Sequence, residues 1–195
     1  MKTSKKILIL NAHPDKNSFC AALSEQYLKG AKKVTAEVKL IHLIDLNFNL
    51  ILKNRQNPEK DLEPDLLEIQ KDIKNAEHLV FVYPTWWGTY PALLKGFIDR
   101  VFLSGFAYKS KENSLLWNKL LTGKTARIIV TMDTPKWYYY LFYGKPGHNS
   151  IKKNILEFCG IKPVKITTLT PIKKSTGQTR NKWLEKIEKL GEKMI

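Results

Sequence analysis

The sequence predicts a doubly wound α/β sandwich, and three observations lead to that class. Several apolar runs are continuous rather than alternating, which is typical of parallel strands covered on both faces. Segments with helical periodicity lie between these runs, so strands and helices alternate along the chain. The 195 residues, 43% of them hydrophobic, are enough for a buried core without a metal or disulfide. We therefore expect residues 1–195 to form a single domain.

Five segments are predicted to be strands. Residues 6–12, 78–83 and 125–132 carry uninterrupted apolar runs, which indicates central strands. Residues 37–43 and 164–169 mix apolar with polar side chains, so we expect these two strands nearer the edges of the sheet.

Helical patterns fill the intervals between the strands. The predicted helices cover residues 18–33, 63–76, 91–102, 150–158 and 180–193. Asp61, Glu63 and Asp65 are interpreted as the acidic start of the second helix rather than as a catalytic carboxylate pair. Two stretches, 47–60 and 104–124, depart from the alternation as long connections.

The formal net charge of +15 calls for an anionic partner. Lysines are spread along the whole chain, and no helix-turn-helix, ribonucleoprotein or zinc-finger spacing is present. We therefore expect no nucleic acid and no metal. An anionic small molecule or contact with anionic lipid headgroups fits the charge at least as well.

The two cysteines and the N-terminal segment give little sign of special chemistry. Cys20 and Cys159 have no CxxC neighbour, so they are interpreted as buried reduced thiols, with a reactive thiol as the alternative. The apolar run 7–10 is too short for a signal peptide, and no run of 18 apolar residues exists. We expect a cytoplasmic protein.

Ligands of open parallel sheets bind outside the carboxyl ends of the strands, so the loops there carry most information. The first loop has no G-x-G-x-x-G motif, but His13 and a helix start at Asn17 and Ser18 could bind a phosphate. The alternatives are an ordinary loop histidine and a plain helix cap. Residues 123–125 resemble the end of a P-loop, but Asn118 stands where glycine is required, which indicates a turn.

The loops after the third and fourth strands are rich in aromatic residues. Adjacent Trp86 and Trp87 suit a planar heteroaromatic ligand, because neighbouring residues seldom both face a core; a structural role for both is the alternative. Six of the seven residues 137–143 are aromatic. This run is interpreted as a lid over a flat substrate, a dimer contact, or a hydrophobic plug over the sheet end.

Three blocks together resemble the flavodoxin-like NAD(P)H:quinone oxidoreductase family. They are Asn-Ala-His-Pro followed by Asn-Ser-Phe at 11–19, the block from Tyr83 to Phe102 that contains Trp-Gly-Thr-Tyr-Pro-Ala-Leu-Leu-Lys-Gly, and Glu-Phe-Cys-Gly at 157–160. The resemblance implies a flavodoxin-like three-layer sandwich with a five-stranded parallel sheet in the order 2-1-3-4-5. It also implies a flavin at the carboxyl edge of that sheet, which we expect to be FMN because the chain is short, with FAD as the alternative.

The resemblance also implies site residues by position. Those of the flavin's phosphate side are His13, Asn17, Ser18 and Phe19. Those along its ring are Pro84, Thr85, Trp86, Trp87 and Gly88. The third flavin loop contains Asp133, Thr134 and Pro135, where the family often has Thr-Thr-Gly-Gly. Tyr108 matches an aromatic that lines the substrate pocket of the partner subunit, and Trp137 is a second substrate contact; Tyr143 and His148 are the catalytic candidates.

The activity implied is two-electron transfer from NAD(P)H to a quinone or another flat acceptor, by a ping-pong mechanism in a homodimer. The choice between NADH and NADPH stays open. A one-electron carrier flavodoxin is disfavoured, because its Thr/Ser-rich phosphate loop with glycine is absent. The alternative from another class is a flavin-binding ancillary subunit of a membrane transporter, docked through its basic charge.

Overall fold

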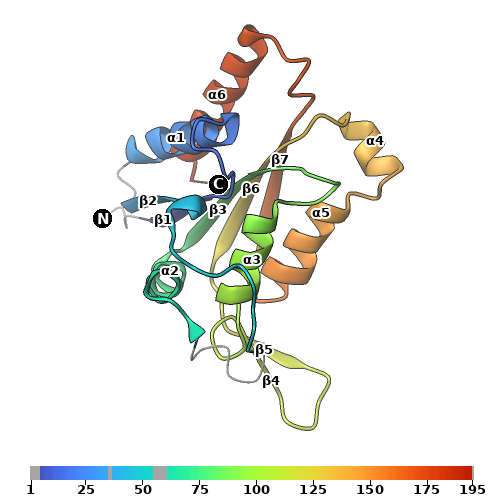
Figure 1. Ribbon diagram of the computed structural model, residues 1–195. Helices are drawn as coiled ribbons and strands as arrows, with labels where there is room; N and C mark the ends of the chain where they lie inside the picture. The colour runs from blue at the N-terminus through green and yellow to red at the C-terminus, as the bar shows by residue number, and fades with distance from the viewer. Residues whose placement is uncertain (1–4, 35–36, 55–60, 195) are drawn as a thin grey trace.

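A computed structural model of the protein describes residues 5–34, 37–54 and 61–194. Its centre is a five-stranded parallel sheet in the order β2-β1-β3-β6-β7, which is the predicted order once a small separate hairpin is set aside (Figure 1). The strands of this sheet are β1 (Lys6–Asn11), β2 (Glu37–His42), β3 (His78–Pro84), β6 (Thr125–Thr131) and β7 (Val164–Leu169). All five predicted strands are confirmed, with ends that differ by one residue at most.

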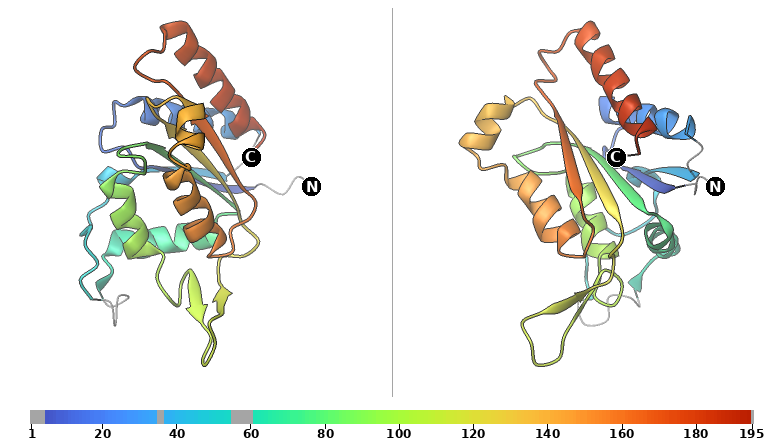
Figure 2. Two further views of the ribbon diagram at one scale, coloured as in Figure 1. Left: turned by 90° about the vertical axis from the view of Figure 1, so that its right-hand side faces the viewer. Right: turned by 180° about the vertical axis from the view of Figure 1, so that it is seen from behind.

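Helices cover both faces of the sheet, which gives three layers (Figure 2). One face packs against α1 (Phe19–Lys32) and α6 (Gly177–Glu192). The other packs against α2 (Pro64–Asn75), α3 (Ala92–Val101), and a last segment that begins as α5 (Pro146–Asn149) and continues as the π-helix η3 (Ser150–Glu157). The five predicted helices are confirmed, although the fourth begins four residues and the fifth three residues earlier than expected.

Burial explains why the central strands are so apolar. Every residue of β3 is buried, because helices lie against both of its faces and strands along both of its edges. The predicted edge strands, β2 and β7, retain exposed positions. Cys20 and Cys159 are buried free thiols, and burial raises the pKa of each to about 12. In the part of the chain that the structure describes, no helix has the length and apolar character needed to cross a membrane.

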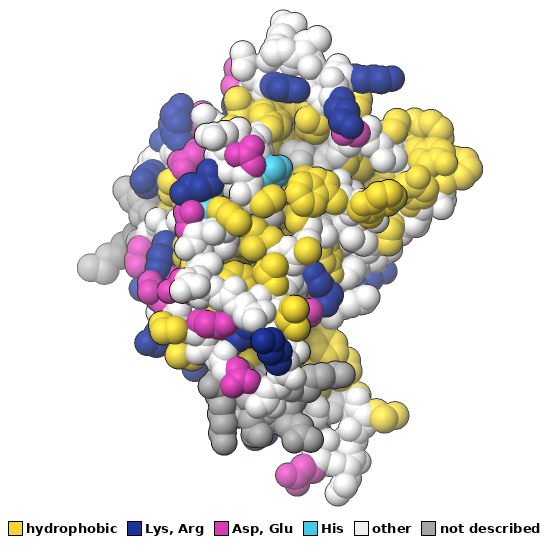
Figure 3. All heavy atoms as spheres, in the orientation of Figure 1, with side chains coloured by type: hydrophobic (Ala, Val, Ile, Leu, Met, Phe, Trp, Pro, Cys, Tyr) yellow, Lys and Arg dark blue, Asp and Glu magenta, His cyan; other side chains and the backbone are white. Residues whose placement is uncertain are grey.

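Four short elements were missed by the sequence analysis. The connection 104–124 contains a hairpin of β4 (Tyr108–Ser110) and β5 (Trp117–Lys119), whose three-residue strands are too short to show alternation. The aromatic run forms a helix, α4 (Lys136–Leu141), and Figure 3 shows hydrophobic side chains gathered over this part of the surface. A single turn of 3-10 helix, η1 (Leu43–Asp45), follows β2. In the other long connection, residues 55–60 lie outside the described ranges.

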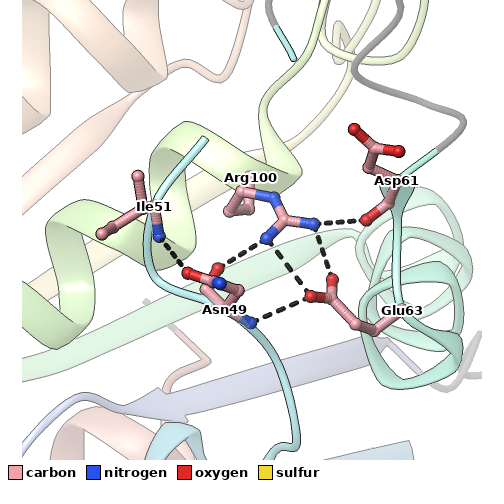
Figure 4. A network of polar contacts seen from close by, with 5 residues as sticks. All are labelled: Asn49, Ile51, Asp61, Glu63 and Arg100. Carbon is pink, nitrogen blue, oxygen red and sulfur yellow. Dashed lines mark hydrogen bonds and ion pairs between the residues drawn. The ribbon is translucent and has the colours of Figure 1, made fainter. Parts of the chain in front are cut away.

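A buried arginine joins α3 to the connection that precedes α2 (Figure 4). The side chain of Arg100 is 4% exposed, and its guanidinium makes a bidentate ion pair with Glu63 at 2.7 and 3.2 Å. The same guanidinium donates to the backbone carbonyls of Asn49 and Asp61. Burial alone would raise the pKa of Glu63, but the backbone N–H of Asn49 and the charge of Arg100 outweigh it and leave that pKa below its usual value. Glu63 therefore does more than start a helix: it pairs with a buried cation.

We predict that Arg100→Met lowers the free energy of unfolding by about 3 kcal/mol, because it strands a carboxylate and two carbonyls that the guanidinium now satisfies. Lys95→Met is the matched control, since it breaks an exposed ion pair with Asp99 on the same helix and should cost less than about 0.5 kcal/mol. Urea denaturation followed by circular dichroism measures both. Equal losses in the two variants would show that the network contributes nothing beyond surface charge.

Candidate functional site

The loops that follow β1, β3 and β6 meet at the carboxyl edge of the sheet, because all three strands run in the same direction. They enclose a cavity of about 220 Å³. The residues that line it are His13, Phe19, Cys20, Pro84, Thr85, Trp86, Thr131, Met132, Asp133 and Ile172. Sequence reasoning missed Ile172, which follows the fifth strand and whose backbone N–H donates to Met132. Its place after a strand end was the signal that could have found it.

The imidazole of His13 is held in one orientation by its own loop. The backbone N–H of Asp15 donates to Nδ1 at 2.9 Å, and the backbone N–H of His13 donates to Oδ1 of Asn11. Burial lowers the pKa of His13, although the charge of Asp15 partly offsets this. The neutral ring then carries its proton on Nε2. Its edge meets the ring of Trp86, with 5.8 Å between centroids, at the mouth of the cavity.

The start of α1 has both features that the sequence analysis offered as alternatives, a helix cap and backbone N–H groups that could bind a phosphate. The Ser18 hydroxyl accepts from the backbone N–H of Ala21, so the helix-cap interpretation is correct for this side chain. The backbone N–H of Asn17 donates to Asp15. The backbone N–H groups of Phe19 and Cys20 have no acceptor within the described ranges. These two donors therefore stand free at the positive end of a 14-residue helix.

The tandem tryptophans occupy a tight reverse turn. Trp86 and Thr89 exchange backbone hydrogen bonds at 3.1 and 3.0 Å, and the residues between them have positive φ angles of 49° for Trp87 and 76° for Gly88. Trp86 is 44% exposed and lines the cavity, whereas Trp87 is fully exposed and does not. Neither indole belongs to the core, which excludes the structural interpretation for both.

One buried tyrosine holds this turn in place. The hydroxyl of Tyr139 donates to the carbonyl of Gly88 at 2.8 Å and accepts from the backbone N–H of Gly147 at 3.0 Å. A Cβ atom on Gly147 would lie 2.9 Å from Cα of Thr89, so only glycine allows the two loops to approach so closely. Tyr139, which belongs to the aromatic run, thus holds the turn of Trp86 to Thr89 in place through hydrogen bonds.

The third loop is fixed by the segment after β7. Asp133 lines the cavity, and its carboxylate accepts from the backbone N–H of Lys173 at 2.7 Å. The carbonyl of Thr134 accepts from the Thr170 hydroxyl, and Pro135 stands directly before α4. Thr134 and Pro135 do not line the cavity.

Much of the rest of the aromatic run faces outward, whereas Tyr138 and Tyr140 are half-buried. Large exposed side chains cover the surface of α4 and the turn after it, namely Trp137, Leu141, Phe142 and Tyr143. The plug interpretation therefore holds for Tyr139 alone, which is fully buried. For the exposed side chains, the two remaining interpretations are a lid over a flat substrate and an interface between subunits.

Two predicted site residues lie elsewhere in the chain. Tyr108 follows the C-terminal end of α3, which runs back from the carboxyl edge of the sheet, and its ring meets that of Phe158 at 5.2 Å. His148 is buried against Tyr139 and Tyr140 and lines a different cavity. Within one chain, neither joins the residues at the carboxyl edge.

Comparisons with known proteins agree with this geometry. A family model described as a flavodoxin-like fold matches residues 5–191. An uncharacterised NAD(P)H oxidoreductase of Haemophilus influenzae is 31% identical, over 80% of this chain and 79% of that protein. The crystal structure of Smu.1420 from Streptococcus mutans is 35% identical with a TM-score of 0.85, over 96% of this chain and 99% of that one. An NAD(P)H:quinone oxidoreductase from Methanothermobacter marburgensis, 23% identical, has the same fold with a TM-score of 0.83, over 99% and 100% of the two chains.

We predict that Tyr139→Phe lowers the free energy of unfolding by about 1 to 2 kcal/mol, because the hydroxyl bonds the buried N–H of Gly147 and the half-buried carbonyl of Gly88. Tyr140→Phe is the matched control: this neighbouring hydroxyl has no hydrogen-bond partner in the described chain, so we expect a change within about 0.5 kcal/mol. Denaturant titration gives both values, and fluorescence of the exposed tryptophans reports whether the turn has loosened. A control that loses as much as Tyr139→Phe would contradict the assigned clamp.

Proposed function

The chain belongs to the flavodoxin-like family, and from this premise we propose that it is a flavin-dependent NAD(P)H oxidoreductase of the quinone-reductase type. Its homologues are oxidoreductases, and quinone reductases are among them. The observation that carries the proposal is the cavity at the carboxyl edge, which has phosphate-type donors at one end and an indole at its mouth. This is where open parallel sheets bind their ligands. We propose the cytoplasm as its location, where reduced nicotinamide is supplied.

The donors around the cavity fit the phosphate end of a flavin. The Nε2 proton of His13 and the unpaired N–H groups of Phe19 and Cys20 converge at the start of α1. Backbone N–H groups at a helix start favour an anion through both hydrogen bonding and the helix dipole. We assign Asn17 and Ser18 to shaping this end of the site, since Ser18 caps the helix and orients the free N–H groups.

The ring end of the site fits a flat heteroaromatic group. Pro84, Thr85 and Trp86 line the cavity from the second loop, and Asp133 lines it from the third. When bound, a flavin accepts a hydride from NAD(P)H and passes two electrons to the acceptor. The chain's task is to hold that group rigidly and to leave one ring face open. The backbone hydrogen bonds of the tryptophan turn and the Tyr139 clamp serve the first of these needs.

Two further features of the proposal concern the ligands. We favour FMN over FAD because the enclosed cavity is small and the chain is short. One open ring face serves both NAD(P)H and the acceptor, so the two substrates bind in turn, as a ping-pong mechanism requires. The exposed Trp87 and Trp137 are suited to cover a flat substrate in that place.

We also propose that the active form is a homodimer. Tyr108 lies away from the cavity of its own chain, so it can serve as a substrate contact only in the cavity of a partner. The exposed aromatic surface of α4 and the projecting hairpin β4–β5 supply apolar area for such an interface. The same argument applies to Tyr143, which is exposed and does not line the cavity of its own chain.

The proposed function is tested with the purified protein loaded with FMN. We expect it to bind the flavin, to oxidise NAD(P)H when a soluble quinone is present, and to give parallel lines in double-reciprocal plots. Flavin retained without turnover would contradict the enzyme and favour an ancillary subunit. Intersecting lines would contradict the shared site.

We predict that Trp87→Ala loses at least tenfold in kcat/KM while its free energy of unfolding changes by less than about 0.5 kcal/mol. The indole is fully exposed and packs on nothing in the core, and alanine keeps the same backbone strain at this positive φ. Leu67→Ala, which removes an exposed apolar side chain on α2, outside both the site and the proposed interface, is the control and should leave both quantities unchanged. A Trp87→Ala protein with wild-type turnover and flavin affinity would show that the second indole has no part in the site.

A further inference from the structure

A second cavity opens beside β7, the edge strand of the sheet. Its volume is about 560 Å³, larger than that of the cavity at the carboxyl edge, and the two share no lining residue. One wall comes from the end of α5 and the first turn of η3, and the other from residues 164–166 of β7. Every charged side chain in the lining is basic: Arg127, Lys145, Lys152, Lys153 and Lys165.

A histidine without partners lies at the inner end of this lining. His148 is 3% exposed, and neither of its ring nitrogens has a hydrogen-bond partner in the described part of the chain. The rings of Tyr139 and Tyr140 meet the imidazole edge-on at 5.0 and 5.6 Å, so they pack against it without satisfying it. A buried polar group left unpaired in this way is costly, which indicates that a ligand supplies the missing partner.

Two of the surrounding lysines lack a counter-charge. The carboxylate of Glu157 lies 3.9 Å from Lys152, but for Lys153 and Lys165 none lies within ion-pair distance among the residues described. Lys145 places its ammonium over the ring of Tyr140, 4.9 Å from the centroid. Four lysines and Arg127 line this one concave surface, so their positive potential is concentrated there.

We propose that this cavity is a binding site for a phosphate group, carried by a small molecule as a phosphate monoester or a pyrophosphate. In the bound state an imidazole N–H of His148 donates to a phosphate oxygen, and Lys145, Lys153 and Lys165 neutralise its charge. An acidic peptide laid along the free edge of β7 would pair with the strand but would not reach an imidazole that is buried so deeply. The site is independent of the proposed redox function.

Binding of such a ligand can be detected through a change in the protonation of His148. Burial, together with the charges of Lys145 and Lys136, lowers the pKa of His148 to about 4. The other titratable groups that face it are the hydroxyls of Tyr139 and Tyr140. A bound dianion stabilises the imidazolium and therefore raises this pKa.

The experiment follows the four histidines by NMR at pH 5 while pyrophosphate, which is doubly charged there, is added at constant ionic strength. We expect one imidazole to move from about one tenth to about one half protonated, which corresponds to a rise of about one unit in its pKa. His148→Gln removes that signal and so assigns it. If this variant fails to fold, contacts to the ring protons of Tyr139 and Tyr140 identify the same signal.

Matched lysine variants test whether the cavity itself is the site. Lys153→Ala combined with Lys165→Ala should weaken pyrophosphate binding about tenfold or more, whereas Lys111→Ala combined with Lys186→Ala, which removes two exposed lysines elsewhere, should change it less than about twofold. Equal weakening by both pairs, or a response that never saturates, would overturn the proposal. So would binding to vesicles of phosphatidic acid without binding of soluble pyrophosphate, which would indicate a lipid surface instead.

Discussion

The burial of β3 on both faces and along both edges is the constraint on which the rest of the structure depends. A strand so enclosed must satisfy its backbone through parallel neighbours on each side, and it needs a helical layer above and below. Parallel neighbours in turn bring their carboxyl ends to one edge. The loops that carry His13, Trp86 and Asp133 meet there for this reason, although up to 120 residues separate them along the chain.

The aromatic run at 137–143 contributes to the structure on both sides of helix α4. The side chain of Tyr139 is buried, and its hydroxyl forms hydrogen bonds with both Gly88 in the tryptophan turn and Gly147 in α5. Tyr139 therefore connects these two segments. Its neighbours on the other side of the helix remain exposed, which is costly for an isolated chain in water. Rigidity on the inner side and exposed apolar area on the outer side together suit a wall of a site that a flat ligand or a second subunit completes.

The sequence was most informative where one physical rule dominates. Continuous apolar runs identified the three central strands, because burial on both faces leaves no freedom in residue type, and the polar mixture of the second and fifth predicted strands identified the edges. It was least informative about contacts made at a distance. Nothing local distinguishes Tyr139 from Tyr138 or Tyr140, and the pairing of Glu63 with Arg100 depends on a crossing of segments that periodicity does not encode. The short hairpin β4–β5 was not predicted for a different reason: a strand of three residues is too short to show an alternating pattern of apolar and polar residues.

The net charge of +15 takes on a different meaning once the lysines are placed in space. Along the sequence they look evenly spread, and such a spread argues only for general attraction to anions. In the structure, several of them are neutralised: Lys33 by Glu188 and Glu192, and Lys39 by Glu68 and Asp72. Among the residues described, Lys145, Lys153 and Lys165 lie beside β7 without such partners, near an imidazole that has none either. The excess charge is therefore partly a local property of one concave surface, and a local excess favours a bound anion over a diffuse one because the cavity walls keep solvent from screening it.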